Sequence, residues 1–271
     1  DTIATPALDA IAESGLVYSQ FVANQRQTNR GLYALLCGDY PYLGNGVPHM
    51  NKVVGMGGRR CLPKVVAEAG YQTAFAQAAP LEFQGIGSFA KGIGFQQAVG
   101  GTWFKDAYAR NDWGVDDRAF FEQSEELIEA LEGEEKPWFV TLVTSGTHHP
   151  FNTVPGDFPA ISGEREMERA IRYADAAVGE LVERLRQKGV LEKTLLIITS
   201  DESLGLPHTE DGQLRWMAGN WSFLLVSGPG ILPGNVTELA MHADLALSLT
   251  DLLGLNDETL SFGGRSIFRN Y

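Results

Sequence analysis

Short apolar runs alternate with amphipathic stretches along most of the chain. Runs of strand length occupy residues 16–22, 71–76, 138–144, 194–200 and 223–227. Apolar positions at helical spacing occupy residues 5–15, 32–37, 62–69, 120–131, 164–188 and 243–253. This alternation predicts an α/β fold with a mostly parallel central sheet flanked by helices.

The apolar run at residues 138–144 has almost no polar position, which is typical of a parallel strand buried on both faces. Two Gly-rich stretches, residues 55–58 and 85–101, are interpreted as long surface loops. Strand and helix patterns resume in phase after each loop, so we expect residues 1–271 to form a single domain.

Composition narrows the class of protein. The 271 residues include 21 Lys and Arg against 34 Asp and Glu, a net charge of −13, and 44% are apolar. The apolar fraction predicts a folded core, and the acidic balance excludes a nucleic-acid binder or a polybasic membrane-surface module. No apolar run reaches the roughly 18–20 residues of a membrane span.

The chain has two cysteines, Cys37 and Cys61. They could be two unrelated buried thiols, or one disulfide of a protein from an oxidising compartment. They do not form a C-x-x-C pair, so we exclude a zinc knuckle.

Three polar clusters follow predicted strands, where open α/β sheets bind their ligands. The first is Gln27-Thr28-Asn29-Arg30-Gly31, just before the helical run 32–37. It would place a hydroxyl at a helix N-terminus, which favours anions. The alternative is that Thr28 is only a helix N-cap.

The second cluster, residues 144–151, contains His148 and His149 after the run 138–144. The alternative is a pair of solvated loop histidines. The third places Asp201 and Glu202 after the run 194–200, with His208 nearby. Carboxylates at a strand end are costly unless they are paired or bind a cation, and a hard divalent metal suits their oxygens. The alternative is an exposed acidic turn.

Together the three clusters predict hydrolysis or transfer of a charged tetrahedral ester. A metal would make a threonine hydroxyl nucleophilic and would stabilise charge on a phosphoryl or sulfuryl group. A histidine could hydrogen-bond the anion or protonate the leaving group.

The sequence also resembles a known family, the sulfatase-fold phosphoglycerol transferases and lipoteichoic acid synthases of the alkaline phosphatase superfamily. The resemblance rests on short motifs that follow the family's order from about Thr5 to Phe268. They are Thr5-Pro6-Ala7-Leu8-Asp9, Thr28-Asn29-Arg30-Gly31, Trp113-Gly114-Val115-Asp116-Asp117, His148-His149-Pro150-Phe151, Tyr173-Ala174-Asp175, Thr199-Ser200-Asp201, Gly228-Pro229-Gly230 and Asp251-Leu252-Leu253-Gly254.

The resemblance implies roles for particular residues. Thr28 matches the nucleophile and a metal ligand, Asp201 a metal ligand, and His148 the histidine that contacts the substrate phosphate. We therefore predict that Arg30 and His149 also bind substrate. The predicted metal ligands are Thr28, Asp201, Glu202 and His208, for one divalent cation, manganese or magnesium in preference to zinc or calcium.

The resemblance further implies a phosphoglycerol-type lipid headgroup or glycan as substrate. It implies a periplasmic or other extracytoplasmic domain, anchored in the inner membrane by N-terminal helices absent from this chain. In that compartment Cys37 and Cys61 are expected to form a disulfide. The family's first strand, which carries a metal-binding carboxylate, would precede Thr5 and is expected to be missing here.

Two departures keep other functions open. Glu202 stands where the family has a metal-binding histidine, which leaves a catalytically decayed protein that binds an anionic glycan or lipid headgroup as an alternative. Residues 83–87 lack the Trp and Arg with which lipoteichoic acid synthases hold glycerol phosphate. A phosphodiesterase is a further alternative. A sulfatase that uses formylglycine is not, because Thr28 cannot become that aldehyde.

Overall fold

The fold was analysed in a computed structural model that describes residues 4–24, 27–40, 60–203, 205, 210–255 and 262–269. Its helices are α1 (Pro6–Glu13), α2 (Thr28–Cys37), α4 (Leu62–Glu68), α5 (Ile86–Ile93), α6 (Asp117–Glu132), α7 (Glu166–Gln187), α8 (Gly212–Ala218) and α9 (His242–Leu252), with short 3₁₀ turns η1 (Phe83–Gly85), η2 (Gly101–Trp103) and η3 (Val190–Lys193). Its strands are β1 (Leu16–Val22), β2 (Gln72–Gln77), β3 (Gln97–Gly100), β4 (Arg110–Asn111), β5 (Gly114–Val115), β6 (Trp138–Val143), β7 (Leu196–Thr199), β8 (Trp221–Ser227), β9 (Gly234–Val236) and β10 (Ala240–Met241).

The sheet strands form two hydrogen-bonded groups. One has the order β10-β1-β8-β7 with β9 also paired to β1, and the other has the order β3-β2-β6. Strands β2, β3 and β6 are mutually parallel, in a register that runs from Gln72 opposite Trp138 to Gln77 opposite Val143. Within the first group only β8 runs against its neighbours. The predicted α/β class with a mostly parallel sheet is confirmed.

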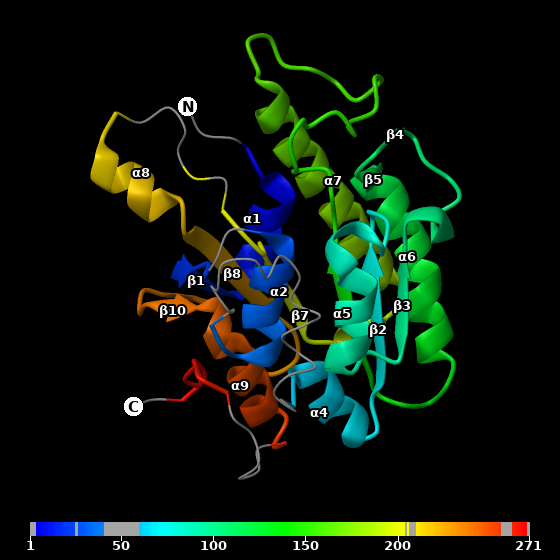
Figure 1. The fold of residues 1–271 in the computed structure, drawn as a ribbon, viewed down its shortest axis with the longest axis vertical. Coiled ribbons are helices and arrows are strands. Elements are labelled where there is room, and N and C mark those ends of the chain that lie inside the picture. Colours follow the sequence, from blue (N-terminus) through cyan, green and yellow to red (C-terminus); the bar gives the residue numbers. More distant parts are fainter. Residues whose placement is uncertain are drawn as a thin grey trace.

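Helices cover both faces of the sheet (Figure 1). On one face, α2, α4, α5 and α9 pack on β1, β2 and β8 in the largest hydrophobic cluster. On the other face lie α1, α6 and α7. Strand β2 shows why: Phe75 belongs to the first cluster, whereas Ala74 and Ala76 belong to the second, as the alternation of side chains along a strand requires.

Two expectations from the sequence are wrong. The stretch 85–101 is not a loop: it contains α5 and β3, and Ile86, Phe89 and Ile93 bury one face of α5. Its glycines suggested a loop, but Gly87 lies against Leu81, where the helix needs a small residue. The other Gly-rich stretch, residues 55–58, lies outside the described residues.

The second wrong expectation concerns β6. Its six residues are all half-buried, not buried, because in the described part of the chain β6 pairs with β2 alone. Strand β7 is likewise half-buried throughout, and among the described strands it pairs only with β8. The apolar sequence of β6 is explained by side chains that pack against hydrophobic clusters on both faces of the strand. One edge of β6 is unpaired among the described residues.

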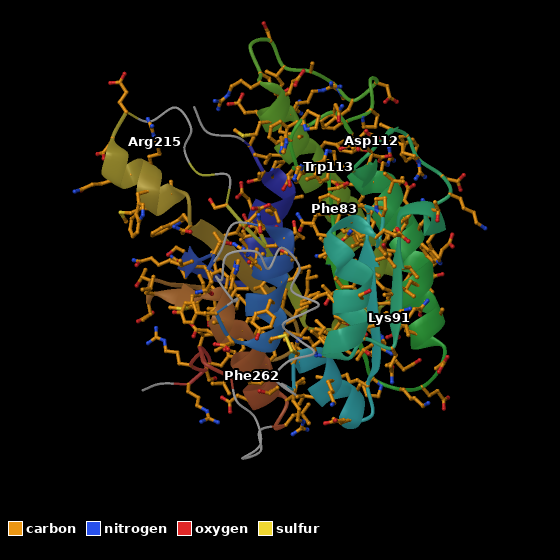
Figure 2. The ribbon with its side chains drawn as sticks, in the orientation of Figure 1. Phe83, Lys91, Asp112, Trp113, Arg215 and Phe262 are labelled. Atoms are coloured by element: carbon orange, nitrogen blue, oxygen red, sulfur yellow. A yellow bond between two sulfur atoms is a disulfide. The ribbon has the colours of Figure 1, made fainter. Side chains whose placement is uncertain are left out.

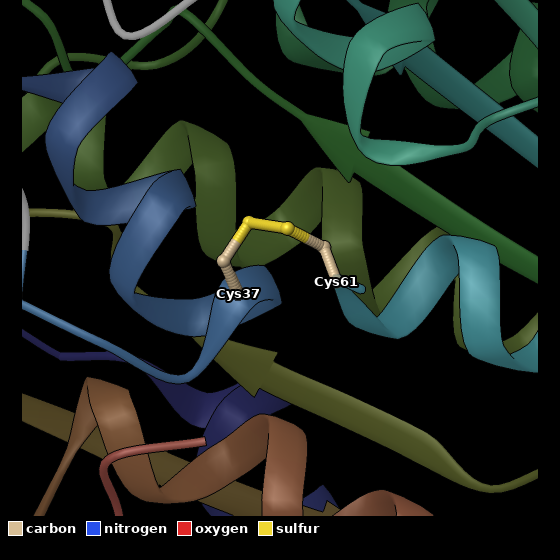
Figure 3. The surroundings of a disulfide bond; sticks show 2 residues. All are labelled: Cys37 and Cys61. Carbon is tan, nitrogen blue, oxygen red and sulfur yellow. A yellow bond between two sulfur atoms is a disulfide. The ribbon is translucent and has the colours of Figure 1, made fainter. Parts of the chain in front are cut away.

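The expected disulfide is present. Cys37 at the end of α2 bonds Cys61, which precedes α4, and both residues are buried (Figure 3). The bond therefore holds the C-terminal end of α2 against the start of α4, which packs in the same hydrophobic cluster. No helix among the described residues is both long enough and apolar enough to cross a membrane.

We predict that reduction of this disulfide lowers the free energy of unfolding by about 3 kcal/mol, because the cross-link closes a loop of 24 residues. Urea unfolding with and without a thiol reductant measures the change. The double variant Cys37→Ser/Cys61→Ser is the control and should be insensitive to the reductant. An unchanged midpoint in the wild-type protein, after thiol titration has shown complete reduction, would contradict the prediction.

Candidate active site

Helix α2 begins at Thr28, and the residue before it holds an unusual backbone conformation. Gln27 is the N-cap with φ 130° and ψ 128°, and its side chain makes no capping hydrogen bond. A side-chain-bearing residue at positive φ is strained, and such strain is concentrated at functional sites. Thr28 is the first helical residue and Gln27 is the N-cap. The alternative interpretation, that Thr28 is only a helix N-cap, is therefore wrong.

The hydroxyl of Thr28 faces Asp201, which follows β7. Asp201 is half-buried, and its carboxyl group lies near the Thr28 side chain and the His148 ring. Burial raises the pKa of this carboxyl above its ordinary value, although the Thr28 hydroxyl and the nearby His148 imidazole both act to lower it. A carboxyl group and a hydroxyl therefore lie close together at the N-terminus of a helix.

Gly31 is what allows the helix to come this close. A Cβ atom at Gly31 would lie 1.9 Å from the main-chain oxygen of Asp201 and 2.8 Å from its carbonyl carbon. Any side chain would thus push α2 away from the end of β7 and separate Thr28 from Asp201. The glycine of the Thr-Asn-Arg-Gly motif is explained by this contact.

Arg30 lies in the first turn of the same helix and is half-buried. Its Nε atom is buried and has no hydrogen-bond partner among the described residues. A buried guanidinium nitrogen without a partner is costly, and an anionic oxygen is the partner that it prefers. The predicted role of Arg30 in substrate binding agrees with this arrangement, which does not by itself test it.

His148 is brought to the site by the turn after β6, where its backbone N–H donates to the Ser145 carbonyl at 3.1 Å. Its Nδ1 lies 2.6 Å from the carbonyl oxygen of His149. Because a carbonyl can only accept, Nδ1 carries the hydrogen, and Nε2 holds the lone pair of the neutral ring. His149 is exposed, and its ring lies 4.5 Å from that of His148.

The other predicted metal ligands are less well placed. Glu202 is half-buried beside Asp201, and His208 lies outside the described residues. Within the residues that can be described, no three His, Cys, Asp or Glu side chains gather closely enough to hold a metal ion. The structure therefore joins Thr28, Asp201 and His148, but it does not assemble the full predicted ligand set.

Two residues that contact the turn around His148, Trp113 and Asp117, were not among the site residues predicted from the sequence. Trp113 lies at the tip between β4 and β5, and its ring packs against the His148 ring in a tilted arrangement with the ring centroids 3.9 Å apart. Phe83 meets the Trp113 ring edge-on, with the centroids 4.8 Å apart. Trp113 and Phe83 lie close together in Figure 2, in agreement with their ring contact. Asp117 is buried at the start of α6 and accepts a hydrogen bond from the Gly146 N–H at 2.9 Å. Trp113 and Asp117 both belong to the Trp-Gly-Val-Asp-Asp motif. The motif indicated the family resemblance, but it did not predict that these residues contact the turn that carries His148.

Two other motifs, Thr5-Pro6-Ala7-Leu8-Asp9 and Tyr173-Ala174-Asp175, hold helices together. Asp175 on α7 accepts hydrogen bonds from the Ala7 and Leu8 N–H groups, at 3.0 and 2.8 Å, and so caps the first turn of α1. The hydroxyl of Tyr173 donates to Asp116 at 2.6 Å. The Tyr-Ala-Asp motif thus ties α7 to α1 and to the start of α6.

Fold and site together define a class. The chain belongs to the sulfatase family, whose model matches residues 1–255. Phosphoglycerol transferase I of Xanthomonas campestris pv. campestris (strain B100) is 29% identical over 221 residues, which cover 78% of this chain and 31% of that protein. The Escherichia coli (strain 55989) protein of the same name is 24% identical over 279 residues, which cover 97% of this chain and 36% of that one. The chain thus spans about a third of the length of these relatives.

Solved structures show the same fold. A protein of the alkaline phosphatase superfamily from Vibrio parahaemolyticus has a TM-score of 0.86 at 23% identity, over 98% of this chain and 64% of the other. The lipoteichoic acid synthase LtaP from Listeria monocytogenes has a TM-score of 0.82 at 16% identity, over 98% and 68%. The alkaline phosphatase and sulfatase-like fold expected from the sequence is confirmed.

We predict that Gly31→Ala destabilises the protein by about 1–3 kcal/mol, because its methyl group meets main-chain atoms that cannot rotate away. Urea unfolding measures the loss. Gly212→Ala is the matched control, since Gly212 also lies in a helix and a Cβ there meets nothing within 4 Å. Equal stability of the two variants would contradict the close contact between α2 and Asp201.

We also predict a pH dependence from Asp117. Burial raises the pKa of its carboxyl from 3.8 to about 6; the Gly146 N–H opposes the rise and the Asp116 charge adds to it. Because the folded state binds this proton more tightly than the unfolded state, the contribution to stability is greatest below about pH 4. It falls as the pH rises to about 6, by about 3 kcal/mol in all.

Asp117→Asn cannot titrate. The difference in unfolding free energy between wild type and variant should therefore fall between pH 4 and pH 6 and be constant above. A flat difference for Asp117→Asn would contradict the prediction.

Proposed function

We propose that the protein is a metal-dependent transferase or hydrolase that acts on phosphoglycerol or a related phospho-ester headgroup, with Thr28 as the nucleophile. The observation that carries this proposal is the close approach of α2 to Asp201 at Gly31, which brings the Thr28 side chain at the N-terminus of the helix near the Asp201 carboxyl group. The relatives named phosphoglycerol transferase support phospho-ester chemistry, and membership of the sulfatase family supports an enzyme.

The residues present suit a hard divalent cation. Carboxylate and hydroxyl oxygens are the ligands that manganese and magnesium prefer, and the Asp201 carboxyl is held where desolvation disfavours its charge without a cation. Thr28 and Asp201 would hold the ion, with Glu202 and His208 as the further proposed ligands. When bound, the cation would make the Thr28 hydroxyl more acidic and would neutralise charge on the phosphoryl oxygens.

The chain's own groups can carry out the remaining steps. The Thr28 hydroxyl gives its proton to solvent and its oxygen attacks phosphorus. The bond between phosphorus and the leaving oxygen breaks, the leaving oxygen takes up a proton from water, and a phospho-threonine forms. The N-terminus of α2 and the Arg30 guanidinium stabilise the phosphoryl oxygens, because both present N–H donors to an anion. His148 hydrogen-bonds the same oxygens through Nε2 when protonated, and the exposed His149 extends the binding surface. Transfer to an acceptor hydroxyl or to water then releases Thr28.

A second candidate function is binding without turnover. Glu202 stands where the resemblance leads us to expect histidine, and in the described residues the carboxylates and histidines do not gather into a three-ligand group. A decayed member of the family would retain Arg30 and His148 for an anionic glycan or lipid headgroup. A phosphodiesterase that releases its product to water remains the alternative among enzymes.

The proposed location is extracytoplasmic, with the protein anchored in the inner membrane by helices outside this chain. The Cys37–Cys61 disulfide supports this proposal, because disulfides persist mainly in oxidising compartments. The anchor itself rests on the resemblance alone.

The test is turnover of bis(p-nitrophenyl) phosphate by the full-length protein with manganese or magnesium. Thr28→Ala should lower kcat about 10³-fold or more, since it removes the nucleophile. Thr237→Ala, at an exposed threonine after β9, is the control and should keep full activity. Mass spectrometry of acid-quenched wild-type enzyme should find phosphate on Thr28.

Equal turnover by the wild-type protein and Thr28→Ala would contradict the nucleophile. If no divalent metal supports turnover and yet calorimetry detects binding of glycerol phosphate, the result favours the decayed alternative. Product in which only water, and never an added glycan, accepts the phosphoryl group favours the phosphodiesterase.

A further inference from the structure

The turn that carries His148 is held from one side by a single short segment, residues 113–117, which we name the clamp segment. The segment runs from the tip of the β4–β5 hairpin to the first residue of α6. It meets the turn Ser145–His148 at three separate points along its length.

The first contact is between rings. The centroids of the Trp113 and His148 rings lie 3.9 Å apart, with an angle of 31° between the ring planes. Phe83 packs edge-on against the same indole at 4.8 Å and 76°. The indole therefore limits rotation of the imidazole about its side-chain torsions, while the hydrogen bond between His148 Nδ1 and the His149 carbonyl sets which nitrogen carries the proton.

The second and third contacts hold the backbone of the turn. The Ser145 hydroxyl donates to the Val115 carbonyl at 3.4 Å, and the Gly146 N–H donates to Asp117 Oδ1 at 2.9 Å. A Cβ at Gly146 would lie 2.3 Å from Asp117 Oδ2, so the turn sits directly on this carboxylate. Each contact reaches a residue within three positions of His148.

The clamp segment is itself firmly anchored. Asp116 accepts hydrogen bonds from the Tyr173 hydroxyl and the Ala119 N–H on one oxygen, and from the Tyr108 and Ala109 N–H groups on the other, at 2.6–3.0 Å. Gly114 adds a backbone contact, since a Cβ there would lie 2.1 Å from the Ala78 carbonyl oxygen. A segment fixed at two of its five residues can impose its position on the turn.

Asp117 is a costly residue to use for structure alone. It is fully buried, and its Oδ2 has no hydrogen-bond partner in the part of the chain that is described. An apolar residue at this position would avoid the cost of a buried carboxylate. Buried polar groups that are left unsatisfied call for an explanation, and control of the turn beside His148 supplies one.

We propose that the clamp segment positions the His148 imidazole for contact with the phosphoryl group, with Trp113 and Asp117 as positioning residues. The inference rests on the proposed function, because it assigns the purpose of the clamp to the reaction in which His148 takes part. Catalysis requires groups aligned to a fraction of an ångström, and misplacement by about 1 Å can cost about 10²-fold in rate. A second element that holds the imidazole meets this requirement.

Kinetics of a double-mutant cycle test the proposal. Trp113→Ala should lower kcat on bis(p-nitrophenyl) phosphate about 10-fold with a smaller change in KM, and Trp113→Phe should restore most of the loss. In the His148→Ala background, Trp113→Ala should cause no further loss, because the residue that it positions is gone. Trp216→Ala, at a tryptophan 75% exposed on α8, is the control and should retain full activity.

An equal loss in both backgrounds would overturn the proposal, since it would show that Trp113 acts on the fold and not through His148. Asp117→Asn can replace Trp113→Ala in the same double-mutant cycle. Its loss of kcat should likewise vanish in the His148→Ala background. Unfolding measurements on every variant exclude a simple loss of folded protein.

An NMR measurement tests the contact between Trp113 and His148 independently of enzyme activity. The NMR signals of the His148 ring carbons and their protons should be shifted upfield by the Trp113 ring current and should move downfield in Trp113→Ala. Unchanged shifts would overturn the clamp whatever the activity. If the shifts behave as expected but His148→Ala turns over substrate normally, the contact of His148 with phosphate is wrong, and the catalytic purpose of the clamp is overturned with it.

Discussion

The close approach of α2 to the end of β7 is the contact on which the site depends. It exists because Gly31 has no side chain where the main chain of Asp201 passes. The other end of α2 is equally constrained: Cys37 is bonded to Cys61, and Gly38 ends the helix at φ 59° against the ring of Phe262. A helix fixed at both ends holds the Thr28 side chain near the Asp201 carboxyl group, and the nucleophilic role proposed for Thr28 would require such preorganisation.

Several buried carboxylates in the described part of the chain are held by backbone N–H groups. Asp116, Asp175 and Asp244 each accept hydrogen bonds from two or more backbone N–H groups and so cap helices or join segments. Asp201 is half-buried and differs in its surroundings, because its carboxyl group lies near the Thr28 side chain and the His148 ring. Backbone amides fix a carboxylate in place, whereas a hydroxyl and an imidazole are groups that can exchange protons or ligands.

A net charge of −13 opposes the approach of an anionic ester, so local positive potential must compensate. The described residues provide it at two places: the N-terminus of α2 and the buried Arg30 Nε. Glu202 acts in the opposite direction unless a cation is bound beside it. This balance links the two proposed functions, because the same carboxylates that would hold a metal would repel the substrate without one.

The sequence by itself determined the α/β class, the order of most elements, the family and the pair of cysteines. These follow from local periodicity and from short motifs, which survive at 29% identity or less. It could not show that α5 lies within the Gly-rich stretch, because its glycines are tolerated only through contacts made by distant residues such as Leu81. Nor could it show that β6 pairs on one side, or that Trp113 and Asp117 reach His148, since these contacts join residues about 30 positions apart. Tertiary structure decides such contacts because they depend on how separate elements pack, which no local pattern encodes.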